Sequence, residues 1–438
     1  MRKKLKIFLS LLLFLSGIIV SYPEGKNPKP KKILEAIHKI ELIDVHSHPM
    51  AGDVKYDPKD EYPKLEPLIS RPFWPIEKKR VAVVDSLEVD GLRELFGYEK
   101  EDVTLDDIPL LEKLGTEFWK AGKREAFNRV LDICKIEKIF CNSVSPEEDL
   151  DQRRVLWVPF VDPLFYVMDP SSLKAIAPEL REALRNYKKA DDELAKKFGL
   201  PITDLRSYLK FVDAVLEDYR KNKAVALKVA SAYIRTLWFD RVEEEEATKI
   251  FEEAKKGKIS SWQEYKRLQD FIARYVFLKA GELNLPVHFH TGFGYTATLK
   301  NLDSNPLNLE SVFSELEFKK TKFVMLHAGY PHWDKLKPML EKRNVFVEFS
   351  AVNWMVFDGE LSQILYEWLS YHGISEKLMF GSDAGTPIFF WIAAENSRKA
   401  LSKAMRRLVE EEIVDEEKAI SLAKKVMREN ARRVHQLE

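Results

Sequence analysis

The stretch Leu42-Ile43-Asp44-Val45-His46-Ser47-His48 decides the fold, because it places two histidines at the end of a short apolar run. In a β-strand, side chains at positions i and i+2 project to the same face. Two neutral imidazoles on one face can bind one divalent metal ion. The alternative is a surface turn that happens to contain two histidines. Further polar residues, each at the end of its own apolar run, weigh against that alternative.

Eight such apolar runs alternate with helical patterns along the chain. Each run is rich in Val, Ile, Leu and Phe, as is typical of strands that are buried on both faces. They cover residues 42–48, 138–142, 155–161, 225–231, 286–291, 322–328, 345–350 and 378–383. Strand–helix alternation predicts a parallel sheet, and eight repeats predict a closed (β/α)8 TIM barrel of the α/β class. Residues 49–136 and 162–223 are far longer than a barrel requires, so we expect a distorted barrel with long helical insertions after strands 1 and 3.

The balance of charged residues bears on the kind of molecule that the protein binds. The 438 residues include 70 basic and 70 acidic side chains, and this balance gives no support for a nucleic-acid partner. Cys134 and Cys141 are too few for a disulfide framework, and we expect buried, unreactive thiols.

The N-terminus predicts export. Four basic residues precede the apolar residues 7–20, which form too short a run for a comfortable membrane span. We therefore expect a signal peptide or an N-terminal anchor over residues 1–21, a linker over 22–35 and one barrel domain over 36–438. The protein is then periplasmic, secreted, or tethered to a membrane by its N-terminal segment.

Three later strands also end in polar residues that suit a metal site. His288 and His290 end the fifth run, His327 ends the sixth, and Asp383 ends the eighth. The strand ends of a barrel converge on one mouth, so these side chains can meet. Each residue alone has a simpler explanation, a hydrogen-bonded core histidine or an aspartate that caps a helix. Together they indicate a site in which His46, His48, His290 and Asp383 bind the metal, while His327 is a second-site ligand or a general acid.

The order of these motifs resembles the amidohydrolase superfamily of metal-dependent barrels. Within it, the chain is most similar to the amidohydrolase-like domain of nodulin- and FluG-type proteins, through the segments 228–235, 285–294, 327–331 and 381–383. The resemblance covers roughly residues 36–438. It implies that His46, His48 and His290 are metal ligands and that Asp383 is a ligand or the catalytic base. It also implies that His327 is a second ligand or polarises the substrate.

Several other residues are candidates for roles in the same site. Lys228 ends the fourth run, where a carbamylated lysine bridges two metals in some members of the superfamily; a buried lysine paired with a carboxylate is the alternative. Tyr233 and Arg235 are candidate substrate-binding residues, because an arginine can clamp a carboxylate. His288 is a candidate support for a ligand or a substrate contact. Glu348, in the seventh run, is expected to orient a histidine.

The predicted function is hydrolysis of a carbon–nitrogen or ester bond of a small molecule by a metal-activated water. Non-oxidative decarboxylation by the same scaffold is the first alternative, and a non-catalytic ligand-binding barrel is the second. We expect zinc, with manganese as the alternative, in one tight site and a weak or empty second site. The sequence leaves a homo-oligomer open.

Overall fold

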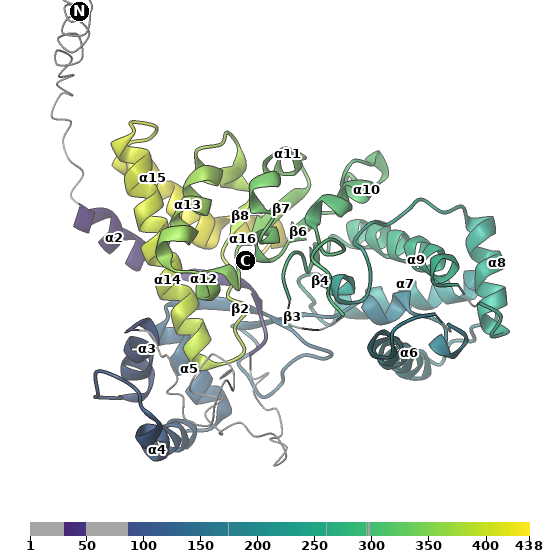
Figure 1. The fold of residues 1–438 in the computed structure, drawn as a ribbon, viewed down its shortest axis with the longest axis horizontal. Coiled ribbons are helices and arrows are strands. Elements are labelled where there is room, and N and C mark those ends of the chain that lie inside the picture. The colour runs from purple at the N-terminus through teal and green to yellow at the C-terminus, as the bar shows by residue number, and fades with distance from the viewer. Residues whose placement is uncertain (1–29, 50–85, 174, 260, 295, 297) are drawn as a thin grey trace, which may run out of the picture.

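Eight short parallel strands form the centre of the protein (Figure 1). The computed structural model describes residues 30–49, 86–173, 175–259, 261–294, 296 and 298–438. Every strand overlaps a stretch that the sequence predicts as strand. They are β1 Leu42–Ser47, β2 Ile136–Asn142, β3 Val155–Val158, β4 Leu227–Val229, β5 Val287–Phe289, β6 Phe323–Met325, β7 Val345–Glu348 and β8 Leu378–Met379. Only β2 extends beyond its predicted run, by two residues at its start.

The strands close into a barrel. Parallel ladders join β1, β2 and β3, and then β4 through β8 in chain order. At the first seam, between β3 and β4, the N–H of Val161 donates to the Lys228 carbonyl at 3.0 Å. At the second seam, the N–H of Val45 donates to the carbonyl of Phe380, just after β8, at 3.1 Å. The predicted distorted (β/α)8 barrel is therefore confirmed.

The interior of the barrel is a packed apolar core. Inward-facing strand residues meet two residues of the C-terminal helix α16 (Asn430–His435), which packs against β1 and β8. The members of this core include Ile43, Val45, Phe140, Val158, Val324, Leu326, Phe346, Met379, Ala431 and Val434. Because apolar side chains fill the interior, the polar residues gather at the carboxyl ends of the strands, as barrel active sites require.

Helices cover the outside of the strands, and a larger apolar core lies between the two layers. The connection between β2 and β3, residues 143–154, contains no helix. The outer helices are α2 Pro30–His38, α8 Glu244–Lys255, α9 Trp262–Glu282, α10 Glu310–Phe313, α11 Lys337–Leu340, α12 Val352–Met355, α13 Asp358–Leu369, α14 Pro387–Glu410 and α15 Glu416–Lys424. Since α2 begins at Pro30, the prediction of a linker over residues 22–35 is wrong for residues 30–35.

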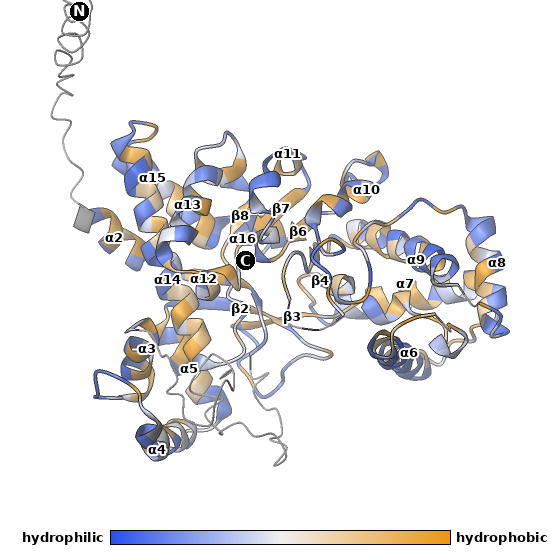
Figure 2. Ribbon diagram, viewed as in Figure 1, coloured by the Kyte–Doolittle hydropathy of each residue, from blue (hydrophilic) through white to orange (hydrophobic). Residues whose placement is uncertain are grey.

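Both predicted insertions are helical. The first contains α3 Ser86–Phe96, α4 Ile108–Trp119 and α5 Lys123–Ile133, and its residues 50–85 lie outside the described part. The second contains α6 Pro178–Phe198 and α7 Leu205–Lys221. Pro178 begins α6 and Gly199, with φ +63°, ends it, as expected for these residues at helix ends. Asp204 and Ser207 form a capping box at the start of α7. In Figure 2, α6 is largely hydrophilic, whereas hydrophobic and hydrophilic residues alternate along α7. Helix α6 also has fewer buried residues than α7, so it is the more exposed of the two.

The described residues contain no helix that is long and apolar enough to cross a membrane. The signal peptide or anchor predicted over residues 1–21 lies outside the described residues. Cys134 and Cys141 are both free and buried, which confirms the prediction of buried thiols. Burial raises the pKa of Cys141 to about 12, so this thiol is held in its unreactive form.

Candidate functional site

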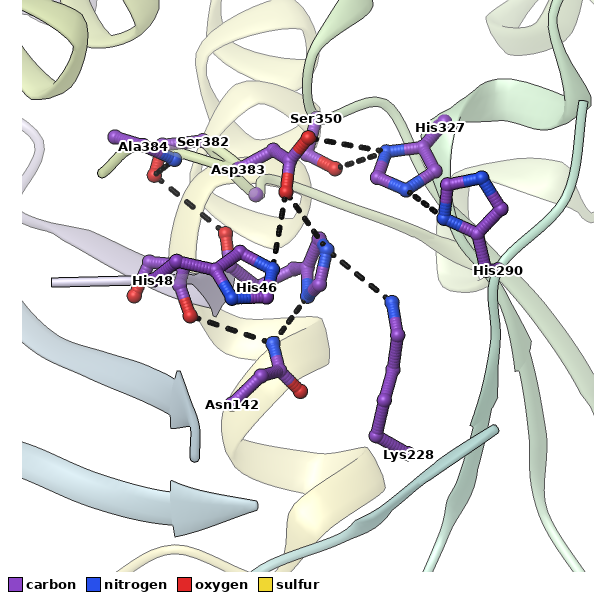
Figure 3. Close-up of polar contacts among 12 residues, drawn as sticks. His46, His48, Asn142, Lys228, His290, His327, Ser350, Ser382, Asp383 and Ala384 are labelled. Atoms are coloured by element: carbon purple, nitrogen blue, oxygen red, sulfur yellow. Dashed lines mark hydrogen bonds and ion pairs between the residues drawn. The ribbon is translucent and has the colours of Figure 1, made fainter. Parts of the chain in front are cut away.

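His46, His48 and Asp383 converge at the carboxyl ends of β1 and β8 (Figure 3). His46 Nε2 lies 3.0 Å from Asp383 Oδ1, and His48 Nε2 lies 3.4 Å from the same oxygen. His46 is buried, whereas the side chain of His48 is 32% exposed. The two histidines of the sequence motif therefore share one carboxylate oxygen, and His48 faces the opening of the barrel.

An irregular backbone brings these groups together. The pairing of β1 with β2 shifts register between Asp44 and Ser47. Asp383 adopts a left-handed conformation with φ +57°, and its N–H donates to the His46 carbonyl at 2.7 Å. Such a conformation costs roughly 1–3 kcal/mol in a non-glycine residue and is concentrated at functional sites. The strain at Asp383 is thus part of how the fold aims this carboxylate at His46.

Asp44 ties the two strands together beneath the site. Its Oδ1 accepts hydrogen bonds from the backbone N–H of Ser382 at 2.8 Å and of His46 at 3.1 Å. Its Oδ2 accepts from the Ser382 hydroxyl. Burial raises the pKa of Asp44 to about 7. Asp44 therefore holds β1 and β8 in register rather than facing the opening.

His327 completes the cluster from the β6 side. It also has a positive φ, +63°, and its N–H donates to Glu348 Oε1 at 2.8 Å. The Ser350 hydroxyl lies 2.9 Å from His327 Nδ1 and 2.7 Å from Glu348 Oε1. Glu348 thus contacts the backbone of His327 and the serine beside its ring, as expected of a carboxylate that orients this histidine.

The hydrogen-bond chain through His290 sets which nitrogen of His327 carries the proton. His290 Nε2 lies 2.9 Å from the Phe293 carbonyl, which can only accept, so Nε2 is the protonated nitrogen. His290 Nδ1 then accepts from His327 Nε2 at 3.0 Å. Burial lowers the pKa of both imidazoles well below the usual value. His327 therefore presents an unprotonated Nδ1 to the site, 4.0 Å from Asp383 Oδ2.

His46, His327 and Asp383 fit a divalent metal ion. One ligand atom from each lies within 4.8 Å of the others. Burial, and then Lys228, lower the pKa of His46 well below its usual value. Burial opposes the ionisation of Asp383, but the neighbouring His327 and His46 outweigh it, so the Asp383 pKa is well below the usual value. Neutral imidazoles and an ionised carboxylate are the forms that bind metals.

His290 stands outside this group of three. Both of its ring nitrogens are engaged, with His327 and with Phe293, and the ring of Tyr233 lies against it at a centroid distance of 4.4 Å. The assignment of His290 as a metal ligand stays a prediction. Tyr233 is half-buried beside the cluster, where it is suitably placed to line a substrate site.

Lys228 lies beside the cluster, with Nζ 3.4 Å from His46 Nε2. Burial lowers the pKa of Lys228 to about 8, against the attraction of Asp383 and Glu348. No carboxylate among the described residues lies within 4 Å of Lys228 Nζ. The described residues therefore do not supply the ion pair that the alternative for Lys228 requires. The position of Lys228 is the one from which a bridging lysine would act.

Arg235 has partners within the protein, which weighs against the sequence prediction that it binds substrate. Its side chain is 1% exposed and forms an ion pair with Asp270. The remaining nitrogens donate to Gln269 Oε1 at 3.1 Å and to the backbone carbonyls of Thr236 and Trp238. The guanidinium is therefore fully used in joining the β4 loop to α9.

The sequence predicts His288 as a support for a metal ligand or as a substrate contact. Its burial contradicts the second of these two roles. It is fully buried, its Nε2 lies 2.8 Å from His435 Nε2 on α16, and its ring stacks against Phe140. His288 thus belongs to the interior of the barrel beneath the site.

Sequence reasoning missed Asn142, the last residue of β2. Its amide nitrogen contacts His46 Nδ1 and donates to the Ser47 carbonyl at 3.3 Å, as Figure 3 shows. Asn142 therefore holds the ring of His46 from the side opposite Asp383. The criterion that found the histidines, a polar residue at the end of an apolar run, applies to Asn142 as well.

Comparison with known proteins agrees with this geometry. A family model described as amidohydrolase matches residues 43–437. A uronate isomerase from Thermotoga maritima has a TM-score of 0.67 at 14% identity, and the match covers 92% of this chain and 96% of that one. A protein from Lactobacillus casei described as a metal-dependent hydrolase has a TM-score of 0.59 at 16% identity, covering 92% and 97%. At these identities the two structures support the fold.

Among curated sequences, the fluG protein of Emericella nidulans is 29% identical over 181 residues. The match covers 40% of this chain and 20% of fluG, so the chain spans only about a fifth of that relative. The resemblance to FluG-type proteins that the motifs indicate is therefore confirmed.

Proposed function

The chain belongs to the amidohydrolase family, and from this premise we propose that it is a metal-dependent hydrolase of small molecules. The bond it cleaves is a carbon–nitrogen bond of the amide type, or an ester. The observation that carries the proposal is the cluster of His46, His327 and Asp383 at the strand ends. Fold alone does not specify chemistry, so the proposal rests on this site.

The residues that would hold the ion are His46 and Asp383, with His48 beside them and His327 or His290 from the opposite wall. When bound, the ion acts as a Lewis acid and lowers the pKa of a coordinated water to roughly 7. Imidazole and carboxylate ligands suit zinc best, and manganese is the alternative. We propose one tightly bound ion and a weak or empty second site, because Lys228 Nζ lies 3.4 Å from His46 Nε2.

Two groups of the site can move protons. Asp383 is ionised and in contact with both His46 and His48, so it can accept a proton at Oδ1 or Oδ2. His327 presents an unprotonated Nδ1, 2.9 Å from the Ser350 hydroxyl oxygen. We assign Asp383 as the base and His327 as the residue that orients or polarises the reacting group. Tyr233 is a candidate wall of the substrate site.

Removal of the metal is the direct test of this function. The purified protein is assayed on a panel of small linear amides, cyclic amides and esters before and after treatment with a chelator. We expect hydrolysis of at least one compound class, loss of turnover in the metal-free protein, and recovery when zinc or manganese is added. Undiminished turnover after complete metal removal would contradict the proposal. Release of carbon dioxide without hydrolysis would replace it with the decarboxylase alternative.

We also propose that the protein is exported, which rests on the basic start and the apolar residues 7–20. Fractionation of cells that produce the full chain should recover it outside the cytoplasm, released or attached to the membrane. A matched chain without residues 2–20 should stay in the cytosol. Recovery of both forms from the cytosol would contradict export.

A further inference from the structure

A cavity of about 530 Å³ lies between the second insertion and α8, and its lining shares no residue with the cluster at the strand ends. Helices α6, α7 and α8 enclose it together with the segment that precedes α6. These helices lie together on the right of Figure 1. None of the residues of the candidate metal site lines this cavity. Its volume is within the range of small-molecule sites.

A buried carboxyl group, Asp191 of α6, lines the cavity. The residue is 3% exposed. Its Oδ1 lies 2.8 Å from the hydroxyl oxygen of Tyr208. Among the described residues no hydrogen bond reaches Oδ2, and the nearest cation there, Lys188 Nζ, is 3.9 Å away. A carboxylate in such a position is desolvated but poorly paired, which is unfavourable unless another donor is supplied.

Tyr208 cannot satisfy Asp191 alone. Its hydroxyl oxygen also lies 2.9 Å from the Leu164 carbonyl. One phenolic proton can be given to only one of these two acceptors. When the Tyr208 hydroxyl donates to the Leu164 carbonyl, a hydrogen bond between Tyr208 and Asp191 Oδ1 requires that Asp191 is protonated and is itself the donor. Consistent with this, burial raises the pKa of Asp191 to about 7.

The other charged groups of the cavity already have partners. Lys188 forms its shorter ion pair with Asp192, Lys255 donates to the Thr203 carbonyl, and Asp169 accepts from the N–H of Ser171. The hydroxyl oxygen of Ser172 also has no hydrogen-bond partner among the described residues, but this atom is fully buried. Asp191 Oδ2 is therefore the oxygen of the lining that is left for a ligand.

The rest of the lining is partly apolar. Met168, Ile202 and Phe251 contribute to it, and Met168 and Phe251 are each 4% exposed. An apolar wall beside a buried carboxyl group matches a ligand that has one cationic end and one short hydrocarbon end.

We propose that this cavity is a binding site for a small primary amine. The ammonium group of the ligand pairs with Asp191 Oδ2, and its short alkyl chain packs against Met168 and Phe251. The charge of the ligand supplies the partner that Lys188 and Tyr208 do not provide, so Asp191 is ionised in the complex.

Isothermal titration calorimetry of the full chain with n-butylamine, n-butanol and butyrate tests the site. These probes differ only in the polar end. We expect one molecule of n-butylamine per chain, and affinity for n-butanol and butyrate lower by about tenfold or more, the value of a hydrogen bond to a buried charge. Asp191→Asn should weaken n-butylamine binding by about tenfold or more. The matched change Glu193→Gln, on the same helix with a 69% exposed side chain outside the lining of the cavity, should alter it by less than about threefold.

Three results would overturn the proposal. These are the absence of n-butylamine binding, equal affinity for n-butylamine and n-butanol, and unchanged binding in a folded Asp191→Asn variant. If Asp191→Asn does not fold, the comparison of the three probes on the unaltered protein decides. The double variant His46→Ala/His48→Ala should keep n-butylamine binding, because the metal site is separate. Failure of this proposal is therefore distinguishable from failure of the proposed hydrolase function.

Discussion

Asp383→Asn is expected to lower turnover by roughly two to four powers of ten, the usual contribution of a general base. Asparagine keeps the shape of the side chain, and its Oδ1 can still accept from His46 and His48. It loses the negative charge that His327 and His46 stabilise by lowering the pKa of Asp383, and it cannot take up a proton near neutral pH. Steady-state kinetics on any substrate found by the panel measures the effect.

Metal analysis of the same variant separates two roles of Asp383. If the carboxylate mainly moves the proton, part of the metal should remain while turnover is lost. If it mainly binds the ion, metal and turnover should fall together. Asp334→Asn removes one exposed carboxylate whose only ion pair among the described residues is with Lys335, so it controls for the change in charge. Near-normal turnover in Asp383→Asn would refute both roles.

The fold was predictable because the strands are buried on both faces. A strand of a parallel barrel contacts helices outside and the core inside, so its sequence is a continuous apolar run that stands out from the amphipathic helices. All eight runs contain a strand. The absence of a helix between β2 and β3 was harder to predict from the sequence, because a short polar connection is compatible with either a loop or a helical turn.

The errors in the site come from contacts between residues far apart in the sequence. Arg235 looked free because its partner, Asp270, lies on α9, and nothing near Arg235 announces that ion pair. The sequence placed His288 two residues before His290 in the same apolar run. It did not show that two residues, roughly 6–7 Å along a strand, separate the opening of the barrel from its interior. At that depth His288 meets His435 of the C-terminal helix.

The supporting residues were partly predictable. Glu348 was found because a carboxylate inside an apolar strand needs a partner, and the structure gives it the His327 backbone and Ser350. Asn142 was missed although it ends its strand in the same way as the histidines. An amide is not a typical metal ligand, so attention to ligand types alone passes over residues that hold the ligands in place.

The second large effect is expected for the double variant His46→Ala/His48→Ala. The unaltered protein should contain one tightly bound divalent ion per chain, and the double variant should retain less than about a tenth of an equivalent. The reason is that both imidazoles contact Asp383 Oδ1. Among the described residues, their removal leaves His327 as the one histidine within 4.0 Å of the Asp383 carboxylate. Metal analysis after dialysis measures the content, and full occupancy in the double variant would contradict the metal assignment.

Lys228→Ala completes this experiment, because it distinguishes one metal site from two. Lys228 Nζ lies 3.4 Å from His46 Nε2, in the space that a second ion would need. A protonated lysine there repels a second cation, whereas a carbamylated lysine would bridge two ions. We expect about one equivalent in the unaltered protein, even after growth with added metal and bicarbonate, and no loss of metal in Lys228→Ala. Two equivalents that fall to one or none in Lys228→Ala would show that Lys228 bridges a pair of ions, and that His290 and His327 hold the second.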